Sequence, residues 1–339
     1  MLNRDLIFKV TVMKVFLIRS GILASLAAVL AFLVGSGMAQ PGTGNIKLRN
    51  ALDFDKDGKA DMTVFRPKTN TWYINKSSGG VIYQTFGLPN EDFLTPGDFD
   101  GDGKADIAVW RDTKGIFYWL NSSNNTFSAK QFGATGDDPV ARDYDGDGKT
   151  DFAVVRRTNG RIIWYILRSL DGKFTSVQFG LSTDFVAPGD YDGDGKFDIA
   201  VQRPGATPTS PATFFILQSS NQTMVASQWG FGTDLVVPGD YDGDGKTDIA
   251  VLREGPTPTS AITWYIRKSS DGKLKALAFG ATGTDLSAQN DYDGDGITDI
   301  AVWRNSTGTF YYVSSQTGTL GAKQWGSPSD FPAAAYDTH

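Results

Sequence analysis

The sequence predicts an all-β protein, a β-propeller of four-stranded blades, on three observations. A nine-residue Asp-rich unit occurs six times, at intervals of 45 to 51 residues. Each unit is followed by a β-branched stretch and then by an aromatic stretch, both typical of strands. Repeats of this length with strand-like content are typical of propeller blades, which stack around an axis and so cover both faces of each sheet.

Each repeat contains four predicted strands, separated by short turns rich in Ser, Asn, Asp and Gly. Strand 1 enters the Asp-rich unit, as residues 185–189 do, and strand 2 leaves it, as residues 249–253 do. Strand 3 is aromatic, as in 263–266, and strand 4 ends in Gln-Phe-Gly, as in 178–180. The Asp-rich unit is therefore expected in the connection between strands 1 and 2 of each blade.

The number of repeats favours six blades, with seven as the alternative. Strands 2, 3 and 4 each occur six times, whereas strand 1 has a seventh copy in residues 330–337, with no Asp-rich unit behind it. Residues 47–52 open the array and residues 330–336 end it. We expect the C-terminal strand 330–336 to close the ring by pairing near the start of the array.

The six Asp-rich units, called Asp loops from this point on, have Asp at positions 1, 3, 5 and 9 and Gly at position 6. Four carboxylates in nine residues repel one another unless a cation lies among them. Ca²⁺ fits because it accepts 6–8 oxygen ligands in flexible geometry, and Gly at position 6 permits the sharp turn. Position 7 contributes only its backbone carbonyl. For about six Ca²⁺, one per loop, the predicted ligands are Asp53, Asp55, Asp57, Lys59 and Asp61; Asp98, Asp100, Asp102, Lys104 and Asp106; Asp143, Asp145, Asp147, Lys149 and Asp151; Asp190, Asp192, Asp194, Lys196 and Asp198; Asp240, Asp242, Asp244, Lys246 and Asp248; and Asp291, Asp293, Asp295, Ile297 and Asp299.

The Asp loops allow two other interpretations. An EF-hand needs a bidentate Glu at position 12 and flanking helices. Position 12 is Val in all six loops, and the residues after position 9 are strand-like, so position 9 has to supply the last acid. The interpretation without metal is a set of solvated Asp-Gly turns.

Residues 1–39 differ in kind from the rest of the chain. Lys14 and Arg19 precede an apolar run over 21–34, and Gly37-Met38-Ala39 follows it. This order is typical of a secretory signal peptide, and the run is shorter than the roughly 20 residues that a transmembrane helix needs. We expect cleavage after Ala39, with an uncleaved anchor as the alternative.

The expected domain organisation follows from that leader. Residues 40–46 form a short linker, and residues 47–339 form a single propeller. No second hydrophobic segment follows, so no transmembrane segment is expected after cleavage. The chain starts at either Met1 or Met13, and the mature protein is expected to be secreted or on the cell surface, with the periplasm as another location.

The composition narrows the possible chemistry. The chain has no Cys, and its one His is His339. Cys nucleophiles and thiolate metal sites are excluded, and a Ser-His-Asp triad or a His-ligated zinc site is disfavoured. The repeated carboxylates are assigned to metal and no other acid pair stands out, so no enzyme activity is predicted. No basic run suggests nucleic acid.

Two charged positions also recur. Position 14 of each repeat is Arg, and an acid lies six residues before each of the second to sixth loops, with Asp330 completing the set. We expect an Arg–Asp pair that ties each blade to the next, bidentate where geometry allows. A ring of Arg that binds acidic sugars is the alternative. The residues are Arg66, Arg111, Arg156, Arg203, Arg253 and Arg304, with Asp92, Asp137, Asp184, Asp234, Asp285 and Asp330.

Strand 3 contains adjacent aromatic residues, which point to opposite faces of a strand and are predicted to be core. The pairs are Trp72-Tyr73, Tyr118-Trp119, Trp164-Tyr165, Phe214-Phe215, Trp264-Tyr265 and Tyr311-Tyr312. Position 13 varies from repeat to repeat. Trp110 and Trp303 occupy it in two repeats and are candidates for stacking on a pyranose, with core packing as the alternative.

These features resemble FG-GAP/VCBS-type repeats, which are similar to those of the integrin α-chain propeller and recur in secreted bacterial proteins. The resemblance rests on the Asp-x-Asp-x-Asp-Gly-x-x-Asp loop, on the Phe-Gly that ends a repeat and on Pro-Gly-Asp before the loop, as in 96–98, 188–190 and 238–240. It covers residues 47–339. It implies Ca²⁺ in the hairpin loop between the first two strands of each blade. Integrin-type propellers have seven blades, and this chain departs from that number.

The predicted function is that of a calcium-binding propeller that acts as a binding or adhesion module, as a monomer, for a glycan or an extracellular protein. A rigid propeller presents its loops as a platform. The alternatives are a Ca²⁺-dependent polysaccharide-active enzyme, a lyase or a hydrolase, and a structural domain of a larger adhesin.

Overall fold

The computed structural model describes residues 51–88 and 91–336. The chain separates into two units, Met1–Ile46 and Lys47–His339, and all described residues belong to the second. The predicted signal peptide (1–39) and linker (40–46) lie outside the described residues. Within the described part, no helix has both the length and the apolar character needed to cross a membrane.

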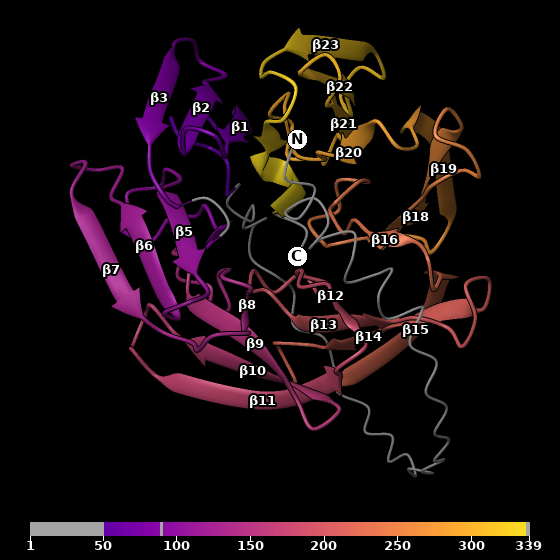
Figure 1. Cartoon of the computed structure of the whole chain (residues 1–339). Helices are drawn as coiled ribbons and strands as arrows, with labels where there is room; N and C mark the ends of the chain where they lie inside the picture. The colour runs from indigo at the N-terminus through magenta and orange to yellow at the C-terminus, as the bar shows by residue number, and fades with distance from the viewer. Residues whose placement is uncertain (1–50, 89–90, 337–339) are drawn as a thin grey trace. The chain divides into compact units, whose positions relative to one another are not determined.

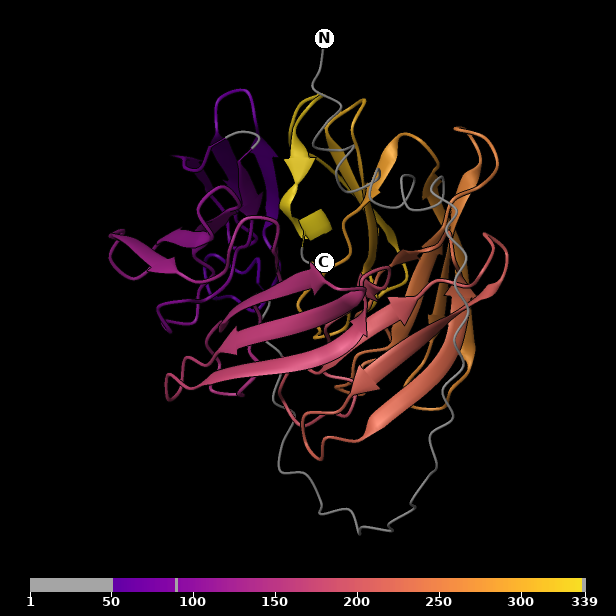
Figure 2. The same cartoon turned by 60° about the horizontal axis from the view of Figure 1, so that its bottom comes forward.

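The described residues form six four-stranded antiparallel sheets arranged in a ring, which is a six-bladed β-propeller (Figure 1). This confirms the all-β prediction with six blades, and the seven-bladed alternative is wrong. Strand 1 of each blade lies toward the middle of the ring and strand 4 at its outside (Figure 1). In Figure 2 the sheets of mid-chain residues, pink to salmon, come forward side by side.

Within each blade the four strands follow one another from the inside of the ring outward. The first three blades are β24 (Phe331–Pro332), β1 (Met62–Arg66), β2 (Thr71–Asn75) and β3 (Val81–Thr85); β4 (Asp92–Leu94), β5 (Ile107–Arg111), β6 (Ile116–Leu120) and β7 (Phe127–Gln131); and β8 (Asp138–Pro139), β9 (Phe152–Thr158), β10 (Arg161–Leu167) and β11 (Phe174–Leu181). The last three are β12 (Phe185–Val186), β13 (Ile199–Arg203), β14 (Pro211–Leu217) and β15 (Met224–Phe231); β16 (Leu235–Val236), β17 (Ile249–Arg253), β18 (Ala261–Arg267) and β19 (Leu274–Ala281); and β20 (Asp285–Ser287), β21 (Ile300–Arg304), β22 (Thr309–Val313) and β23 (Leu320–Gln324).

The hydrophobic pattern of each strand matches its place in the blade. Strand 2, as in β17 with Ile-Ala-Val-Leu-Arg, is apolar on both faces because a neighbouring blade covers each face. Strand 3 alternates, so that in β18 every second residue is buried. Strand 4 has no buried residue in β19, where each residue is exposed or half-buried, because this strand forms the outer edge of the sheet. The core therefore lies between blades, around strands 2 and 3.

The ring is closed by the C-terminus. β24 pairs with β1 through Val64↔Pro332 and Phe65↔Phe331, and so supplies strand 1 of the first blade. The predicted closing strand 330–336 is correct in place but too long, because residues Ala333–Tyr336 form a 3₁₀ helix, η1. Two paired residues match the other blades, where strand 1 has only two or three residues.

Each blade except the fourth buries one tryptophan, whose Nε1 donates a hydrogen bond to the main-chain carbonyl of the aromatic residue before the closing Gly of its repeat. These bonds run from Trp72 to Phe86, Trp110 to Phe132, Trp164 to Phe179, Trp264 to Phe279 and Trp303 to Trp325, at 3.0–3.2 Å.

The proposal that Trp110 and Trp303 stack on a sugar is therefore wrong, because both side chains are 0% exposed. Across the sheet Trp110 faces Phe117, whereas in blade 3 the indole comes from Trp164 on strand 3 and faces Val155 on strand 2. Cross-strand neighbours share one face of a sheet, so either strand can place the indole in the same space.

The same exchange adds a buried aromatic residue to strand 3 of blades 2 and 6, Phe117 or Phe310, one residue before the predicted pair. The predicted pairs Tyr118-Trp119 and Tyr311-Tyr312 are half-buried and pack against the core. In blade 3 the pair behaves as predicted in part, since Trp164 is fully buried and Tyr165 half-buried.

The Arg–Asp pairs form in all six blades and are bidentate, but each connects strands 1 and 2 of one blade rather than two blades. Arg156 Nε and Nη2 donate to the two oxygens of Asp137 at 2.7 and 2.8 Å. The other pairs are Arg66–Asp330, Arg111–Asp92, Arg203–Asp184, Arg253–Asp234 and Arg304–Asp285. The link to the preceding blade comes from the Asp itself, which also accepts a backbone N–H from that blade.

Candidate metal centres

Each Asp loop lies directly before strand 2 of its blade, and in blades 2 to 6 it follows strand 1. Its local shape is imposed by its own first carboxylate. In loop 5, Asp240 Oδ1 accepts the N–H of Gly243 at 2.6 Å and Oδ2 accepts the N–H of Gly245 at 2.9 Å. Both glycines have positive φ, 79° and 84°, a conformation that a side chain disfavours. The Asp at position 1 therefore folds the turn that aims positions 3 and 5 inward.

The Asp at position 9 accepts hydrogen bonds from two different segments of its blade. Asp248 Oδ2 accepts the N–H of Tyr241 at position 2 of its own loop, at 2.8 Å. Its Oδ1 accepts the N–H of Ser269 at 2.6 Å, from the hairpin between strands 3 and 4. The carboxylate is fully buried, and it joins the loop to the outer half of the same blade.

A serine in the strand 3–4 hairpin of every blade was missed in the sequence analysis. The Ser269 hydroxyl donates to Asp244 at 2.8 Å, and the Ser270 hydroxyl donates to Asp242 at 2.5 Å. The first serine recurs in every blade as Ser77, Ser122, Ser169, Ser219, Ser269 and Ser315, each with its N–H on position 9 and its hydroxyl on position 5. Its recurrence two residues after the end of strand 3 in every blade was the available signal.

In each of five Asp loops the structure brings three of the four predicted carboxylates together. Among the described residues there are six groups of acids whose oxygens lie within 4.8 Å of one another, and any such group could hold a metal ion. Five of them are Asp53, Asp55 and Asp57; Asp98, Asp100 and Asp106; Asp143, Asp145 and Asp151; Asp190, Asp192 and Asp194; and Asp240, Asp242 and Asp248. Positions 1 and 3 occur in all five groups, joined by position 5 or position 9.

The burial of these acids raises the energy of their charged form. Desolvation raises the pKa of Asp61 to about 6 and that of Asp151 and Asp198 to about 7, although backbone N–H groups oppose the shift. The pKa of position 1 is shifted in the same direction by the same cause, as in Asp240. A cation at the centre of the group would offset this cost.

Among the residues that the structure describes, two buried carboxylate oxygens lack a hydrogen-bond partner, Asp55 Oδ1 and Asp242 Oδ1. The Asp242 side chain is only 3% exposed. Buried polar atoms almost always have a partner, and a carboxylate oxygen needs a donor or a cation. The donor set contains oxygen alone, so these groups fit a hard cation. The predicted backbone carbonyl ligands at position 7 stay a prediction.

The sequence matches the family described as FG-GAP-like repeat over residues 53–109 and 143–201. Each matched segment starts at position 1 of one Asp loop and ends at position 12 counted from the start of the next Asp loop. The chain contains FG-GAP-like repeats. No curated protein matches this sequence.

Solved structures resemble this chain only at low sequence identity. One is a triple mutant of AofleA from Arthrobotrys oligospora, with 10% identity and a TM-score of 0.46 over 84% of this chain and 86% of that chain. Another is an oligogalacturonate lyase in complex with manganese, with 13% identity and a TM-score of 0.49 over 81% of this chain and 77% of that chain.

The Phe-Gly that characterises FG-GAP-like repeats has a direct structural role in this chain. Gly180 has φ of 106°, and a Cβ on it would lie 3.1 Å from Val201, which is position 12 of the next repeat. Gly230 meets Val251 and Gly280 meets Val302 in the same way. The Gly therefore permits close packing of consecutive blades, and this contact explains why position 12 is always Val.

The residue after each of these glycines donates its N–H to the Asp of the Arg–Asp pair in the next blade. For example, Ala134, which follows the last strand of blade 2, donates its N–H to Asp137 of blade 3 at 2.8 Å. Arg156 of blade 3 donates to the same carboxylate. The other donors are Leu88, Leu181, Phe231, Ala281 and Ser327. The carboxylate of each such Asp therefore holds the link between two consecutive repeats and also joins strands 1 and 2 of its own blade.

Neighbouring Asp loops are also bonded to one another in a closed circuit. The N–H at position 8 of each loop donates to the carbonyl at position 1 of the preceding loop, at 2.6–2.9 Å. The bonds run from Ala60 to Asp291, Ala105 to Asp53, Thr150 to Asp98, Phe197 to Asp143, Thr247 to Asp190 and Thr298 to Asp240. The first loop therefore meets the sixth, and the candidate metal centres form one connected ring.

Proposed function

We propose that this protein is a secreted or cell-surface calcium-binding β-propeller that acts as a binding or adhesion module for a glycan or an extracellular protein. The observation that supports it most is the set of six oxygen-only acid groups joined by backbone hydrogen bonds. Calcium would hold the loops in place, and the rigid ring would present the connections on its faces to a partner.

The types of ligand atom in the Asp loops favour calcium over other cations. Carboxylate and carbonyl oxygens suit Ca²⁺ and Mg²⁺, and the described groups offer no imidazole or thiolate. Mg²⁺ requires near-ideal octahedral geometry and retains several waters, whereas the Asp loops bring several carboxylates to one point. We expect about six ions per chain, bound by the Asp positions and by the carbonyl at position 7.

The proposal is tested by a metal count and by thermal unfolding of residues 40–339. A ligand that binds only the folded state stabilises it by about 2.7 kcal/mol at a hundredfold excess over Kd. We expect about six Ca²⁺ per chain after desalting, and a large fall in Tm when a chelator removes them. A metal-free chain with an unchanged Tm would contradict calcium binding.

Binding of a partner is tested with a glycan array and a panel of extracellular matrix proteins, each probed with the calcium-loaded protein. We expect specific signals that disappear with chelator. The absence of any signal would favour the alternative of a structural domain within a larger adhesin. Secretion is tested by expressing the full chain with a C-terminal tag and locating the processed product.

We also propose that the protein is not an enzyme. The acids of the Asp loops accept hydrogen bonds from backbone N–H and serine groups, as Asp248 does, which suits a metal ligand better than an acid or base catalyst. Incubation with pectic and neutral oligosaccharides, analysed for new ends, is the test. Calcium-dependent cleavage would establish the polysaccharide-active alternative instead.

A further inference from the structure

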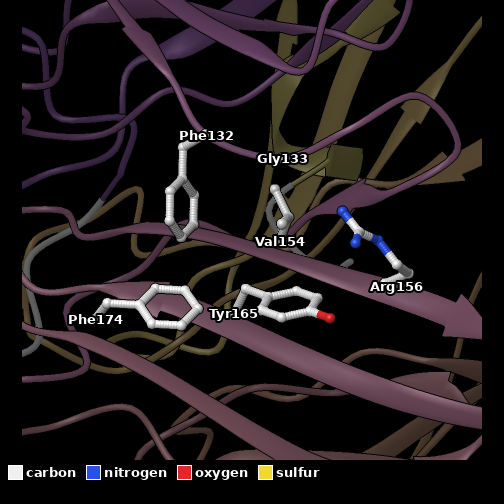
Figure 3. A pocket seen from close by; sticks show the side chains of 6 residues that line it. All are labelled: Phe132, Gly133, Val154, Arg156, Tyr165 and Phe174. Carbon is white, nitrogen blue, oxygen red and sulfur yellow. The ribbon is translucent and has the colours of Figure 1, made fainter.

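A small hollow lies between blades 2 and 3 and is not part of the metal centres. Its volume is about 180 Å³, and its lining is Phe132, Gly133, Val154, Arg156, Tyr165 and Phe174 (Figure 3). Phe132 and Gly133 follow β7 of blade 2, and the other four residues come from β9, β10 and β11 of blade 3. Pockets for drug-sized ligands are roughly 300–1,000 Å³, so this hollow admits a single ring-sized group.

One wall of the hollow is aromatic. The rings of Tyr165 and Phe174 are stacked with centroids 6.0 Å apart, and the Phe132 ring meets Phe174 edge-on at 6.3 Å. Figure 3 shows these three rings around one side of the hollow. Phe174 is 59% exposed, so unlike the tryptophans of the core it presents its ring to solvent.

The opposite end of the hollow is polar. Figure 3 shows the Arg156 guanidinium there, with the phenol oxygen of Tyr165 directed toward it. The guanidinium lies 4.9 Å from the Tyr165 ring centroid. Asp137 accepts from Nε and Nη2 and balances the charge, while the Arg156 side chain stays 38% exposed. A guanidinium has five N–H groups, and those not used by Asp137 or by the Tyr165 side chain are left for a ligand.

We propose that this hollow binds one neutral pyranose ring of a glycan. The C–H face of the sugar lies against Phe174 and Tyr165, and a sugar hydroxyl accepts a hydrogen bond from Arg156. A proline or aliphatic side chain would use the rings but not the remaining N–H groups of Arg156, and Asp137 removes the net charge that would attract an acidic sugar. This assignment rests on the proposed function and specifies its ligand.

Related aromatic walls occur at neighbouring blade junctions. In blade 2 the Tyr118 and Phe127 rings are stacked at 5.8 Å, and in blade 1 Tyr83 is stacked on Trp325 at 6.3 Å. In blades 4 to 6 the residue that corresponds to Phe174 is Met224, Leu274 or Leu320, so the wall loses its outer ring. These blades provide internal controls.

The test is saturation-transfer NMR on the calcium-loaded mature chain with methyl glucopyranoside, methyl galactopyranoside, methyl fucopyranoside and, as a charged probe, methyl galacturonate. We expect at least one neutral pyranoside to receive saturation on its C–H face. Phe174→Ala should weaken that binding roughly two- to tenfold, as expected for an aromatic contact, and Phe174→Trp should restore it. The matched control is Leu274→Ala, which removes a side chain that is 57% exposed at the same position of blade 5.

Three results would overturn the assignment. They are equal binding by the Phe174→Ala and Leu274→Ala variants, no transfer to any neutral pyranoside, and stronger transfer to methyl galacturonate than to any neutral sugar. If a glycan array responds equally to the wild type and to Phe174→Ala, the hollow is not the site but the proposed function stands. If the wild type recognises neither glycan nor extracellular protein, the proposed function itself fails.

Discussion

The carboxylate of Asp242 illustrates how single residues define the candidate metal centres. Its Oδ2 accepts the Ser270 hydroxyl, while Oδ1 is buried with no hydrogen-bond partner among the described residues. One of its two oxygens lies within 4.8 Å of an oxygen of Asp240 and of Asp248. An amide in its place would keep an oxygen ligand but would remove the negative charge that favours cation binding. The same chain also offers an acid outside the Asp loops for comparison, Asp271 in the neighbouring hairpin.

We predict that Asp242→Asn lowers the bound calcium by about one ion per chain and lowers the Tm of the calcium-loaded protein. The physical reason is the loss of one anionic oxygen ligand from a site of few ligands. Metal analysis after desalting, together with thermal unfolding, provides the measurement. Asp271→Asn is the control, and an equal metal count for both variants would argue against the site.

Gln202 is a residue whose replacement should help the fold. It occupies position 13 of the fourth repeat and is fully buried, and neither its Nε2 nor its Oε1 has a hydrogen-bond partner in the described part of the chain. The corresponding residue of the fifth repeat is Leu252, which is buried in the core.

Gln202→Leu is expected to raise the free energy of unfolding by about 1–3 kcal/mol, because an unsatisfied buried amide carries a desolvation penalty of this size. Chemical denaturation in the presence of calcium measures the effect. Leu252→Gln serves as the reciprocal variant and should destabilise the protein. A loss of stability in Gln202→Leu would indicate that the amide has a partner such as a buried water.

Among the structural elements, the Asp loop responds to pH through its buried acids. The pKa of Asp151 and of Asp198 is raised from 3.8 to about 7 by burial. Between those values, the metal-free folded state retains protons that the unfolded state has lost. The free energy of unfolding of the metal-free protein should therefore fall as the pH rises from about 4 to about 7.

We predict opposite pH trends with and without calcium. The metal-free protein should have a higher Tm at about pH 5 than at about pH 7.5, whereas the increase in Tm on adding calcium should be larger at the higher pH. Calcium and protons compete for the same oxygens, which explains the second trend. Thermal unfolding at the two pH values measures both, and a metal-free Tm that increases with pH would contradict the burial argument.

At the scale of the whole molecule, the ring depends on one pair of segments that are distant in sequence. Arg66 in β1 and Asp330 beside β24 are 264 residues apart, and their ion pair helps hold the C-terminal strand in the first blade. Arg203 and Asp184 make the same bidentate pair within blade 4, only 19 residues apart. The two pairs differ mainly in whether they close the ring.

Asp330→Asn should therefore destabilise the protein more than Asp184→Asn. Each substitution loses charge-assisted hydrogen bonds, a loss of about 2 kcal/mol. Only the first also loosens the contact that prevents the ring from opening at its ends. Urea unfolding in saturating calcium, with equilibrium and unfolding rates measured for both variants, makes the comparison. Equal effects would mean that this pair contributes nothing special to closure.

Much of this architecture follows from the sequence by itself. The Asp loops, the alternation of strands and the surplus copy of strand 1 predict a six-bladed propeller closed by its C-terminus, and the structure agrees. These features are local, because period, turn residues and carboxylate spacing are each expressed within a few adjacent positions. The expected approach of the carboxylates within a loop is local for the same reason.

Other features were decided only by tertiary structure. Whether Trp110 faces solvent or core depends on its cross-strand neighbour Phe117, and sequence period cannot distinguish the two faces of a strand that is covered on both sides. The Arg–Asp pairs lie within blades, and Ser269 reaches an Asp loop more than 20 residues away in sequence. Such contacts depend on how separate strands and hairpins pack, which no single segment of the sequence contains.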